Sequence, residues 1–234
     1  MATTLADLFR GEMLQFDGVS RFSPSRRFTA IFRQSDPADS IFFVSAGLVK
    51  LFNRGHDNKE VTLRIAAPGE WFGEDALTEN ATRGSSAEVV QEAVIFTIPR
   101  TVLSAFAAKR PEFWPLVVNS LAERLRSAEE KVQLLCTADV ETRILHFVRS
   151  LASRLKDDGQ SSHFSIPLSQ SELASLIGGT REASSTALNM LARKGVLDLR
   201  RRLMVIPSLE ALEPSPAEEA AEALSASAQA GSRP

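Results

Sequence analysis

Seven apolar residues recur along one stretch of the sequence in steps that alternate between four and three residues. An average step of about 3.5 residues is the period of a coiled-coil seam, and it predicts a long helix over about residues 112–137. We expect a second copy of the chain to cover this seam and to make the protein a homodimer. The alternative is an amphipathic helix that lies on its own domain. The seam consists of Trp114, Val118, Leu121, Leu125, Ala128, Val132 and Leu135.

Short apolar or alternating runs precede this helix between Phe28 and Pro99. Several short strands at such spacing are typical of an antiparallel sandwich or barrel. Turn residues separate the runs, and Gly47 is expected to separate the first two. The runs are residues 41–44, 48–52, 61–65 and 94–98. A short helix is predicted before them at residues 5–9, and another after them at residues 100–109.

The segment from Leu168 to Leu191 predicts two short helices joined by a tight turn. Ser169 and Glu172 have the spacing of a capping box at the start of the first helix. Gly178 stands where a helix ends in the left-handed conformation, and Thr180 is placed to cap the second helix. Two helices joined in this way form a helix-turn-helix motif. The alternative is an ordinary helical hairpin.

A basic hairpin is expected after the second helix, because the apolar runs 196–199 and 203–206 flank three consecutive arginines. The chain has a net charge of −2, so a wholly basic nucleic-acid coat protein is excluded. Residues 139–207, however, hold 10 Lys and Arg against 7 Asp and Glu. A helix-turn-helix followed by a basic hairpin is a winged form, and the local positive charge favours binding to DNA.

The N-terminal residues of the second helix face base edges if this helix enters the major groove. Arg181 is then expected to bond guanine and Glu182 to accept from cytosine, with Ser185 and Thr186 one turn further along. The alternative for Glu182 is an acid that the helix dipole favours. Phosphate contacts are expected from residues at the helix starts and the hairpin tip, namely Ser169, Ser171, Thr180, Arg200, Arg201 and Arg202.

Composition excludes several other classes of function. The single cysteine, Cys136, cannot supply a disulfide framework or a multi-thiolate metal site, and the three histidines show no metal spacing. No apolar run approaches the ~20 residues of a membrane span, and residues 1–7 lack the pattern of a signal peptide, so we expect a cytoplasmic protein. We find no phosphate loop, nucleophile motif or paired catalytic acids in the sequence, and therefore expect a protein that is not an enzyme.

The order of these parts resembles the CRP/FNR family of bacterial transcription regulators over about residues 5–207. Three stretches carry the resemblance: residues 32–44 leading to Gly47, Pro68-Gly69-Glu70-Trp71-Phe72-Gly73-Glu74, and Thr180-Arg181-Glu182. The resemblance implies an α+β fold with an N-terminal antiparallel β-roll of the cupin-like jelly-roll type, a long dimerisation helix and a C-terminal winged helix-turn-helix. The expected divisions are 1–111 for the effector domain, 112–138 for the dimerisation helix, 139–207 for the DNA-binding domain and 208–234 for a disordered Ala/Glu/Ser/Pro tail. Asp139 is similar to the hinge aspartate of the family.

The resemblance also implies an effector pocket. In members that bind cyclic AMP, a Gly-Glu pair and a later Arg hold the ribose and phosphate, and Gly73, Glu74 and Arg83 match them. The hydroxyl residue after that Arg is Gly84 here, with Ser85 next, and the hydroxyl pair on the dimer helix is replaced by Ala128 and Glu129. The expected ligand is a cyclic nucleotide or another small anion, and cyclic AMP itself is disfavoured. The alternative is an internal structural pair of Glu74 and Arg83 in a pocket that has lost its ligand. An iron–sulfur cluster, used by the oxygen-sensing branch, is excluded by the single cysteine.

We therefore expect a homodimeric, sequence-specific transcription regulator that binds double-stranded DNA at a two-fold symmetric site. RNA polymerase is the further partner that the resemblance implies, and no membrane partner is expected. The alternative is a cyclic-nucleotide sensor module that acts on a protein partner and carries a degenerate helix-turn-helix. The Arg181-Glu182 pair and the basic hairpin tip argue against that alternative.

Overall fold

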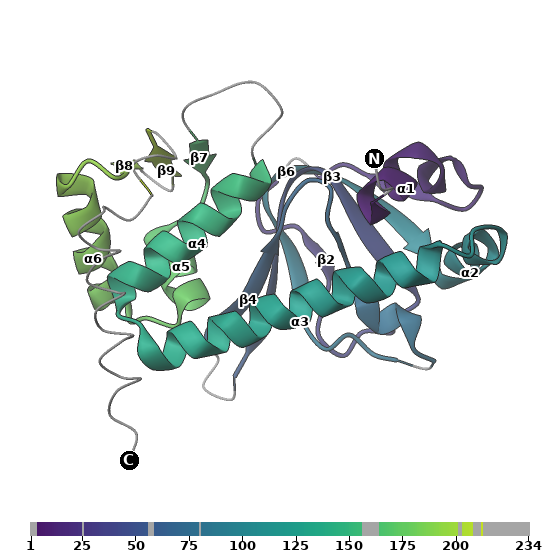
Figure 1. Ribbon diagram of the computed structural model, residues 1–234, viewed down its shortest axis with the longest axis horizontal. Helices are drawn as coiled ribbons and strands as arrows, with labels where there is room; N and C mark the ends of the chain where they lie inside the picture. The colour runs from purple at the N-terminus through teal and green to yellow at the C-terminus, as the bar shows by residue number, and fades with distance from the viewer. Residues whose placement is uncertain are drawn as a thin grey trace, which may run out of the picture.

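The computed structural model describes residues 4–24, 26–55, 59–79, 81–155, 164–200, 203–207 and 212. The described chain forms a β-roll and a helical part with a small sheet of its own, and one long helix joins the two (Figure 1). This arrangement confirms the predicted α+β fold with its antiparallel sheet and helix-turn-helix. Arg201, Arg202 and the predicted tail at 208–234, apart from Leu212, lie outside the described residues.

The β-roll is built on a six-stranded antiparallel sheet in the order β1-β6-β3-β4, with β2 paired to β6 and β5 paired to β3. The predicted runs all fall within three long strands, β3, β4 and β6. The shorter strands β1, β2 and β5 were not distinguished in the sequence. The bounds are β1 Ser20–Phe22, β2 Ala30–Phe32, β3 Ser40–Arg54, β4 Glu60–Ala66, β5 Trp71–Phe72 and β6 Ser86–Pro99.

The expected turn at Gly47 is wrong, because residues 41–44 and 48–52 belong to the single strand β3. Gly47 has a φ of +80°, and the pairing of β3 with β6 shifts register on both sides of it. A glycine in the left-handed region can form a bulge that kinks a strand without ending it. The same sequence signal therefore marks a bulge here and not a turn.

Two apolar clusters fill the β-roll. The inner cluster contains Phe32, Phe42 and Phe72, and the rings of Phe42 and Phe72 stack with centroids 5.1 Å apart. The second cluster, which includes Phe43 and Phe106, lies under α1 (Leu5–Gly11), α2 (Arg100–Lys109) and the start of α3. Two 3-10 helices complete this part, η1 (Met13–Gln15) and η2 (Glu74–Leu77).

Helix α3 (Phe113–Thr137) agrees with the predicted long helix and extends past the β-roll to the helical part (Figure 1). Its first turns bury Phe113 and Val117 against the β-roll. The chain then reverses direction at Asp139 and begins α4 (Val140–Leu155). The Oδ1 atom of Asp139 accepts a hydrogen bond from the backbone N–H of Thr142 at 2.8 Å, which lowers the pKa of the Asp139 carboxyl.

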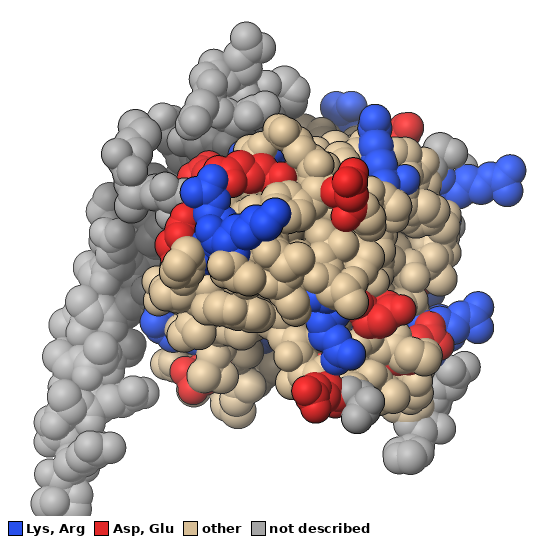
Figure 2. Space-filling view, turned by 90° about the vertical axis from the view of Figure 1, so that its right-hand side faces the viewer, with Lys and Arg blue, Asp and Glu red and all other residues tan. Residues whose placement is uncertain are grey.

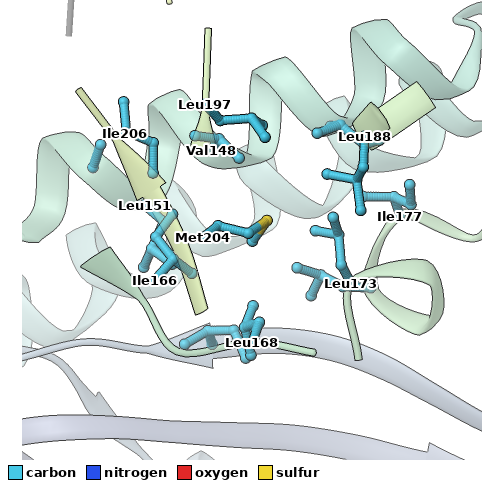
Figure 3. Close-up of a cluster of buried hydrophobic side chains, with 14 of the residues drawn as sticks. Val148, Leu151, Ile166, Leu168, Leu173, Ile177, Leu188, Leu197, Met204 and Ile206 are labelled. Carbon is cyan, nitrogen blue, oxygen red and sulfur yellow. The ribbon is translucent and has the colours of Figure 1, made fainter. Parts of the chain in front are cut away.

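The helical part packs α4, α5 (Gln170–Ile177) and α6 (Arg181–Arg193) against a three-stranded sheet in the order β7-β9-β8. Its strands are β7 (Phe164–Ile166), β8 (Asp198–Arg200) and β9 (Leu203–Ile206). The buried side chains of this core converge from all of these elements, and Figure 3 shows Val148, Leu173, Leu188 and Met204 among them.

The core of the helical part continues onto the outer face of the β-roll. Leu48, Ile65, Ala67 and Val90 are at most 1% exposed and belong to the same apolar cluster as the helix-turn-helix residues. Helix α5 is also held on β4 by its Ser175, whose Oγ donates to the carbonyl of Glu60 at 2.8 Å and accepts from the N–H of Thr62 at 2.9 Å. The two parts of the chain therefore share one interface with an apolar centre.

No helix among the described residues is long and apolar enough to span a membrane. The described residues also contain no group of three or more His, Cys, Asp or Glu that is placed to hold a metal ion. The end of the molecule on the side of α1 and α2 shows basic and acidic side chains scattered among uncharged ones (Figure 2). The visible part of this face therefore carries no large patch of one charge that would attract DNA.

The bulge at Gly47 leads to the first prediction. A Cβ atom at Gly47 would lie 2.1 Å from the carbonyl oxygen of Glu92. Gly47→Ala should therefore lower the free energy of unfolding by about 2 kcal/mol or more, measured by urea denaturation. The control is Gly11→Ala at the end of α1, where an added Cβ meets nothing within 4 Å and stability should change by no more than about 1 kcal/mol. Equal stability of the two variants would contradict the bulge.

Candidate DNA-binding surface and effector pocket

The helix-turn-helix is fixed by the caps that its sequence predicts. The Ser169 Oγ accepts from the N–H of Glu172 at 3.2 Å, and the Glu172 carboxylate accepts from the N–H of Ser169 at 2.7 Å. Gly178 ends α5 with a φ of +63°, and the Thr180 Oγ1 accepts from the N–H of Ala183 at 3.2 Å to begin α6. These local bonds set the angle between the two helices, because each one fixes where a helix starts or stops.

Helix α6 has one buried face and one exposed face. Ser184, Ala187, Leu188 and Leu191 are buried, and the Ser184 Oγ donates to the carbonyl of Thr180 at 2.7 Å. On the other face, Arg181, Glu182 and Thr186 are exposed, and Ser185 is half-buried. The four residues predicted to read bases therefore lie on the side of α6 that faces away from the core or at its edge.

Sequence reasoning missed Asn189, which is exposed on the same side of α6. Asn189 lies three residues after Thr186 and four after Ser185, so the helical repeat would have revealed it. An asparagine amide can bond both the acceptor and the donor on the major-groove edge of adenine. Asn189 therefore extends the candidate reading surface by one turn.

A cleft of about 260 Å³ lies between the starts of α5 and α6 and the hairpin strands β8 and β9. The structure brings Ser169, Ser171, Arg181 and Arg200 together around this cleft. Gln170, which sequence reasoning missed, also lines it, and the apolar floor consists of Leu168, Leu199, Leu203 and Met204. The guanidinium groups of Arg181 and Arg200 and the hydroxyls of Ser169 and Ser171 are suited to contact with phosphate oxygens.

The predicted phosphate residues differ in where they lie. The Thr180 hydroxyl caps α6, and Thr180 does not line the cleft. Arg200 does line the cleft, and its Nε donates to the Asp198 carboxylate at 3.1 Å. Arg201 and Arg202 lie outside the described residues. The cleft thus joins four of the residues expected from the sequence and leaves the hairpin tip undescribed.

The effector residues Gly73 and Arg83 lie in direct contact inside the β-roll. Arg83 is 3% exposed, and its Nη1 and Nη2 donate to the carbonyls of Gly73 at 3.0 Å and Ser40 at 2.7 Å. Its guanidinium carbon lies 4.4 Å from the centroid of the Phe32 ring and 5.3 Å from that of Phe42. Burial lowers the pKa of Arg83, and the nearby acids Asp75 and Asp39 partly offset this effect.

Glu74 is placed on the outer side of the same segment, where it contacts arginines and not Arg83. Its Oε2 lies 3.2 Å from Nη1 of Arg124 on α3 and 3.6 Å from Nη2 of Arg64 on β4. Arg124 also donates to the carbonyl of Trp71 and stacks over the Trp71 ring with its guanidinium carbon 4.1 Å from the centroid. Burial, together with repulsion by Arg64, lowers the pKa of Arg124 to about 10.

The remaining predicted effector residues do not join this cluster. Ser85 is half-buried in the bend after Arg83, and Ala128 and Glu129 are exposed on α3. Further along α3, Lys131 reaches β4, where its Nζ donates to the carbonyls of Thr62 at 2.9 Å and Leu63 at 3.0 Å. Burial lowers the pKa of Lys131 to about 8. Sequence reasoning missed Lys131, although it lies seven residues after Arg124, two helical turns further along the same face.

Comparison with known proteins places these sites in a family. Residues 25–110 match the cyclic nucleotide-binding domain, and residues 142–215 match the Crp-like helix-turn-helix domain. A "CRP-like cAMP-activated global transcriptional regulator" of Mycobacterium tuberculosis is 30% identical over 183 residues, which cover 78% of this chain and 82% of that protein. The chain belongs to the CRP/FNR family of transcription regulators.

Solved structures of CRP/FNR regulators share the fold. FixK2 from Bradyrhizobium japonicum superposes with a TM-score of 0.71 at 23% identity, over 84% of this chain and 98% of that one. A regulator of Xanthomonas campestris described as c-di-GMP responsive gives a TM-score of 0.64 at 26% identity, over 80% of this chain and 93% of that one. The family consists of transcription regulators and not of enzymes.

The predicted seam of this CRP/FNR regulator lies mostly on the exposed side of α3. Val118 and Leu125 are each 61% exposed, Val132 is 59% exposed, and Trp114 and Leu135 are 44% and 40% exposed. Ala128 is exposed as well, whereas Leu121 is half-buried and packs against the β-roll core. The large apolar side chains of the seam therefore form a row on α3 that is separate from the face bearing Arg124 and Lys131. Such an exposed apolar row has the geometry of a surface for a second helix.

Proposed function

We propose that this CRP/FNR regulator binds double-stranded DNA in a sequence-specific manner, as a homodimer. The observation that carries the proposal is the exposed N-terminal half of α6, with Arg181 and Glu182 next to the cleft that Ser169, Ser171 and Arg200 line. In this arrangement α6 inserts into the major groove, Arg181, Glu182, Ser185 and Thr186 face bases, and the cleft holds a backbone phosphate.

The dimensions of the helix are compatible with this role. Helix α6 has 13 residues, which corresponds to about 20 Å at 1.5 Å per residue and fits the ≈12 Å wide major groove at an angle. Two copies that pair along α3 would present two α6 helices to half-sites about 34 Å apart on one side of a two-fold symmetric site. Residues 1–111 then serve as the effector domain, 112–138 as the dimerisation helix and 139–207 as the DNA-binding domain.

The effector proposal is a small anion with a neighbouring hydroxyl, held by the segment from Gly73 to Ser85. The buried guanidinium of Arg83 supports it, because the Arg83 Nε is buried and has no hydrogen-bond partner among the described residues. The residues fit a cyclic nucleotide only in part, since both terminal nitrogens of Arg83 already donate to backbone carbonyls and Glu74 pairs with Arg124. The names of the relatives differ in effector, one being called cAMP-activated and another c-di-GMP responsive.

The DNA proposal is tested by selecting bound sequences from a random duplex pool. A two-fold symmetric consensus is the expected result. Arg181→Ala should weaken binding by about 1–3 kcal/mol and relax the preference at one base position in each half-site. Arg193→Ala, which removes the same charge from the exposed C-terminal end of α6, should keep the consensus. If Arg181→Ala weakens all sequences alike, Arg181 is a phosphate contact. If the wild-type chain selects no consensus, the alternative of a sensor that acts on a protein partner is favoured.

The dimer is tested at Leu125, which is 61% exposed in the single chain and so tolerates a charge without unfolding it. Leu125→Glu should convert the protein from dimer to monomer in sedimentation velocity, because two carboxylates would face each other in an apolar seam. Arg126→Glu changes the charge of the neighbouring exposed residue and should leave the dimer intact. A wild-type chain that sediments as a monomer at micromolar concentration would contradict the proposed homodimer.

The effector proposal is tested by calorimetric titration with cyclic AMP and cyclic GMP. Each missing donor weakens binding by about 0.5–1.5 kcal/mol. Gly84 removes one donor beside Arg83, and Ala128 and Glu129 remove the hydroxyls that the family resemblance places on the dimer helix, so that the three together should move a micromolar site in the dimer to near-millimolar Kd. Arg83→Met should abolish the remaining binding. Micromolar binding of cyclic AMP that is lost in Arg83→Met and coupled to DNA affinity would overturn this ordering in favour of an ordinary cyclic-AMP receptor.

A further inference from the structure

Five charged side chains form an alternating chain between the DNA-binding part and the dimer helix. The Nη1 of Arg154 on α4 lies 2.9 Å from Oε1 of Glu70, and Oε2 of Glu70 lies 3.9 Å from Nη1 of Arg64. The Nη2 of Arg64 lies 3.6 Å from Oε2 of Glu74, which in turn lies 3.2 Å from Arg124 on α3. Neighbouring members have opposite charge along the whole row, which we call the ion chain.

The ion chain holds both helices that meet at Asp139 on one short segment of the β-roll. Arg124 belongs to α3 and Arg154 to α4, whereas Glu70 and Glu74 lie four residues apart around β5. The backbone of this segment is fixed, because the N–H of Gly69 donates to the carbonyl of Val44 and the N–H of Val44 donates to the carbonyl of Glu70, both at 2.8 Å. These two bonds tie the turn at Gly69 and Glu70 to β3.

The charges of the ion chain do not cancel. Three arginines and two glutamates give a net charge of +1, and loss of the charge at Glu74 raises it to +2. Arg64 would then keep Glu70 as its ion partner in the row, and the attraction of Glu74 would no longer offset the repulsion among Arg64, Arg124 and Arg154. These side chains are 21–37% exposed, so each pair is weak, but pairs that share partners act together.

We propose that Glu70 and Arg154 are positioning residues that link the state of Glu74 in the effector segment to the docking of α4, and so to the placement of α6. The functional role of this link rests on the proposed function, in which Glu74 belongs to the effector segment and α6 to the DNA-binding surface. In the docked state α6 keeps its reading face exposed, so docking through the intact ion chain is the state that binds DNA. Loss of the charge at Glu74 or at Arg154 loosens α4 and weakens DNA binding.

The first experiment does not depend on DNA. Hydrogen–deuterium exchange of the full-length Glu74→Gln variant should be faster in α4, with which Glu74 makes no direct contact, as well as around Arg124. Arg154→Gln should speed exchange in α4, and Arg154→Lys, which keeps the charge, should restore most of the protection. The control Arg126→Gln removes an exposed charge from α3 and should leave α4 unchanged. If Glu74→Gln changes exchange only in its own contacts, the link is refuted.

The second experiment is a double-mutant cycle on DNA affinity. Glu74→Gln and Arg154→Gln should each weaken binding about fivefold, and the double variant should be little weaker than either single variant. Multiplication of the two effects to about 25-fold would show independent residues and overturn the link, as would tighter binding in either single variant. If no variant and no wild-type protein binds DNA while α4 exchange still responds to Glu74→Gln, the DNA-binding proposal fails and the link between Glu74 and α4 stands.

Discussion

The apolar contact between the outer face of the β-roll and the helix-turn-helix core determines where the helix-turn-helix lies relative to the β-roll. Leu48, Ile65, Ala67 and Val90 would be exposed on the sheet without it, and each is at most 1% exposed with it. Burial of a Val, Leu or Ile side chain contributes about 1.5–3 kcal/mol, so Leu48, Ile65 and Val90 together stabilise the interface by several kcal/mol. The two parts of the chain therefore form one body, in which the position of α6 depends on the sheet.

Polar contacts at the rim of this interface set its orientation, because an apolar contact alone permits sliding. Arg27 of the β-roll donates through Nη1 to the carbonyl of Pro167 at 2.9 Å, and its Nη2 lies 3.2 Å from the Glu172 carboxylate. Glu172 is also the acid of the α5 capping box, so the start of the first helix of the motif is joined directly to the β-roll. Ser175 on α5 and Arg154 on α4 supply two further contacts, and the four contacts together orient the helical part on the β-roll.

The parts of the structure that the sequence predicts well are those fixed by nearby residues. The capping box of Ser169, the glycine end of α5 and the cap at Asp139 each involve bonds over three or four residues, and the long helix depends on a local repeat. The ion chain was not predictable in this way, since it joins residues 64, 74, 124 and 154 from four elements with residue 70 in the turn before β5. The bulge at Gly47 shows the same limit, because a glycine between two apolar runs has the same local sequence whether it turns the chain or kinks a strand.

The effector segment illustrates why matching residues do not establish a ligand. A Cβ atom at Gly73 would lie 2.8 Å from Nη1 of Arg83, and Gly73 has a φ of +83°, so the fold itself requires glycine there. Arg83 in turn is held by two carbonyls and two aromatic rings, which compensate for the cost of burying its charge. Glycine and arginine would therefore persist in a β-roll that had no ligand. The buried Arg83 Nε has no partner among the described residues, a property it shares with the Nε atoms of Arg27 and Arg143, and at Arg83 an unpaired buried donor costs about 1–3 kcal/mol. An anion that accepted from this nitrogen would recover that cost, and for this reason we keep an effector in the proposed function.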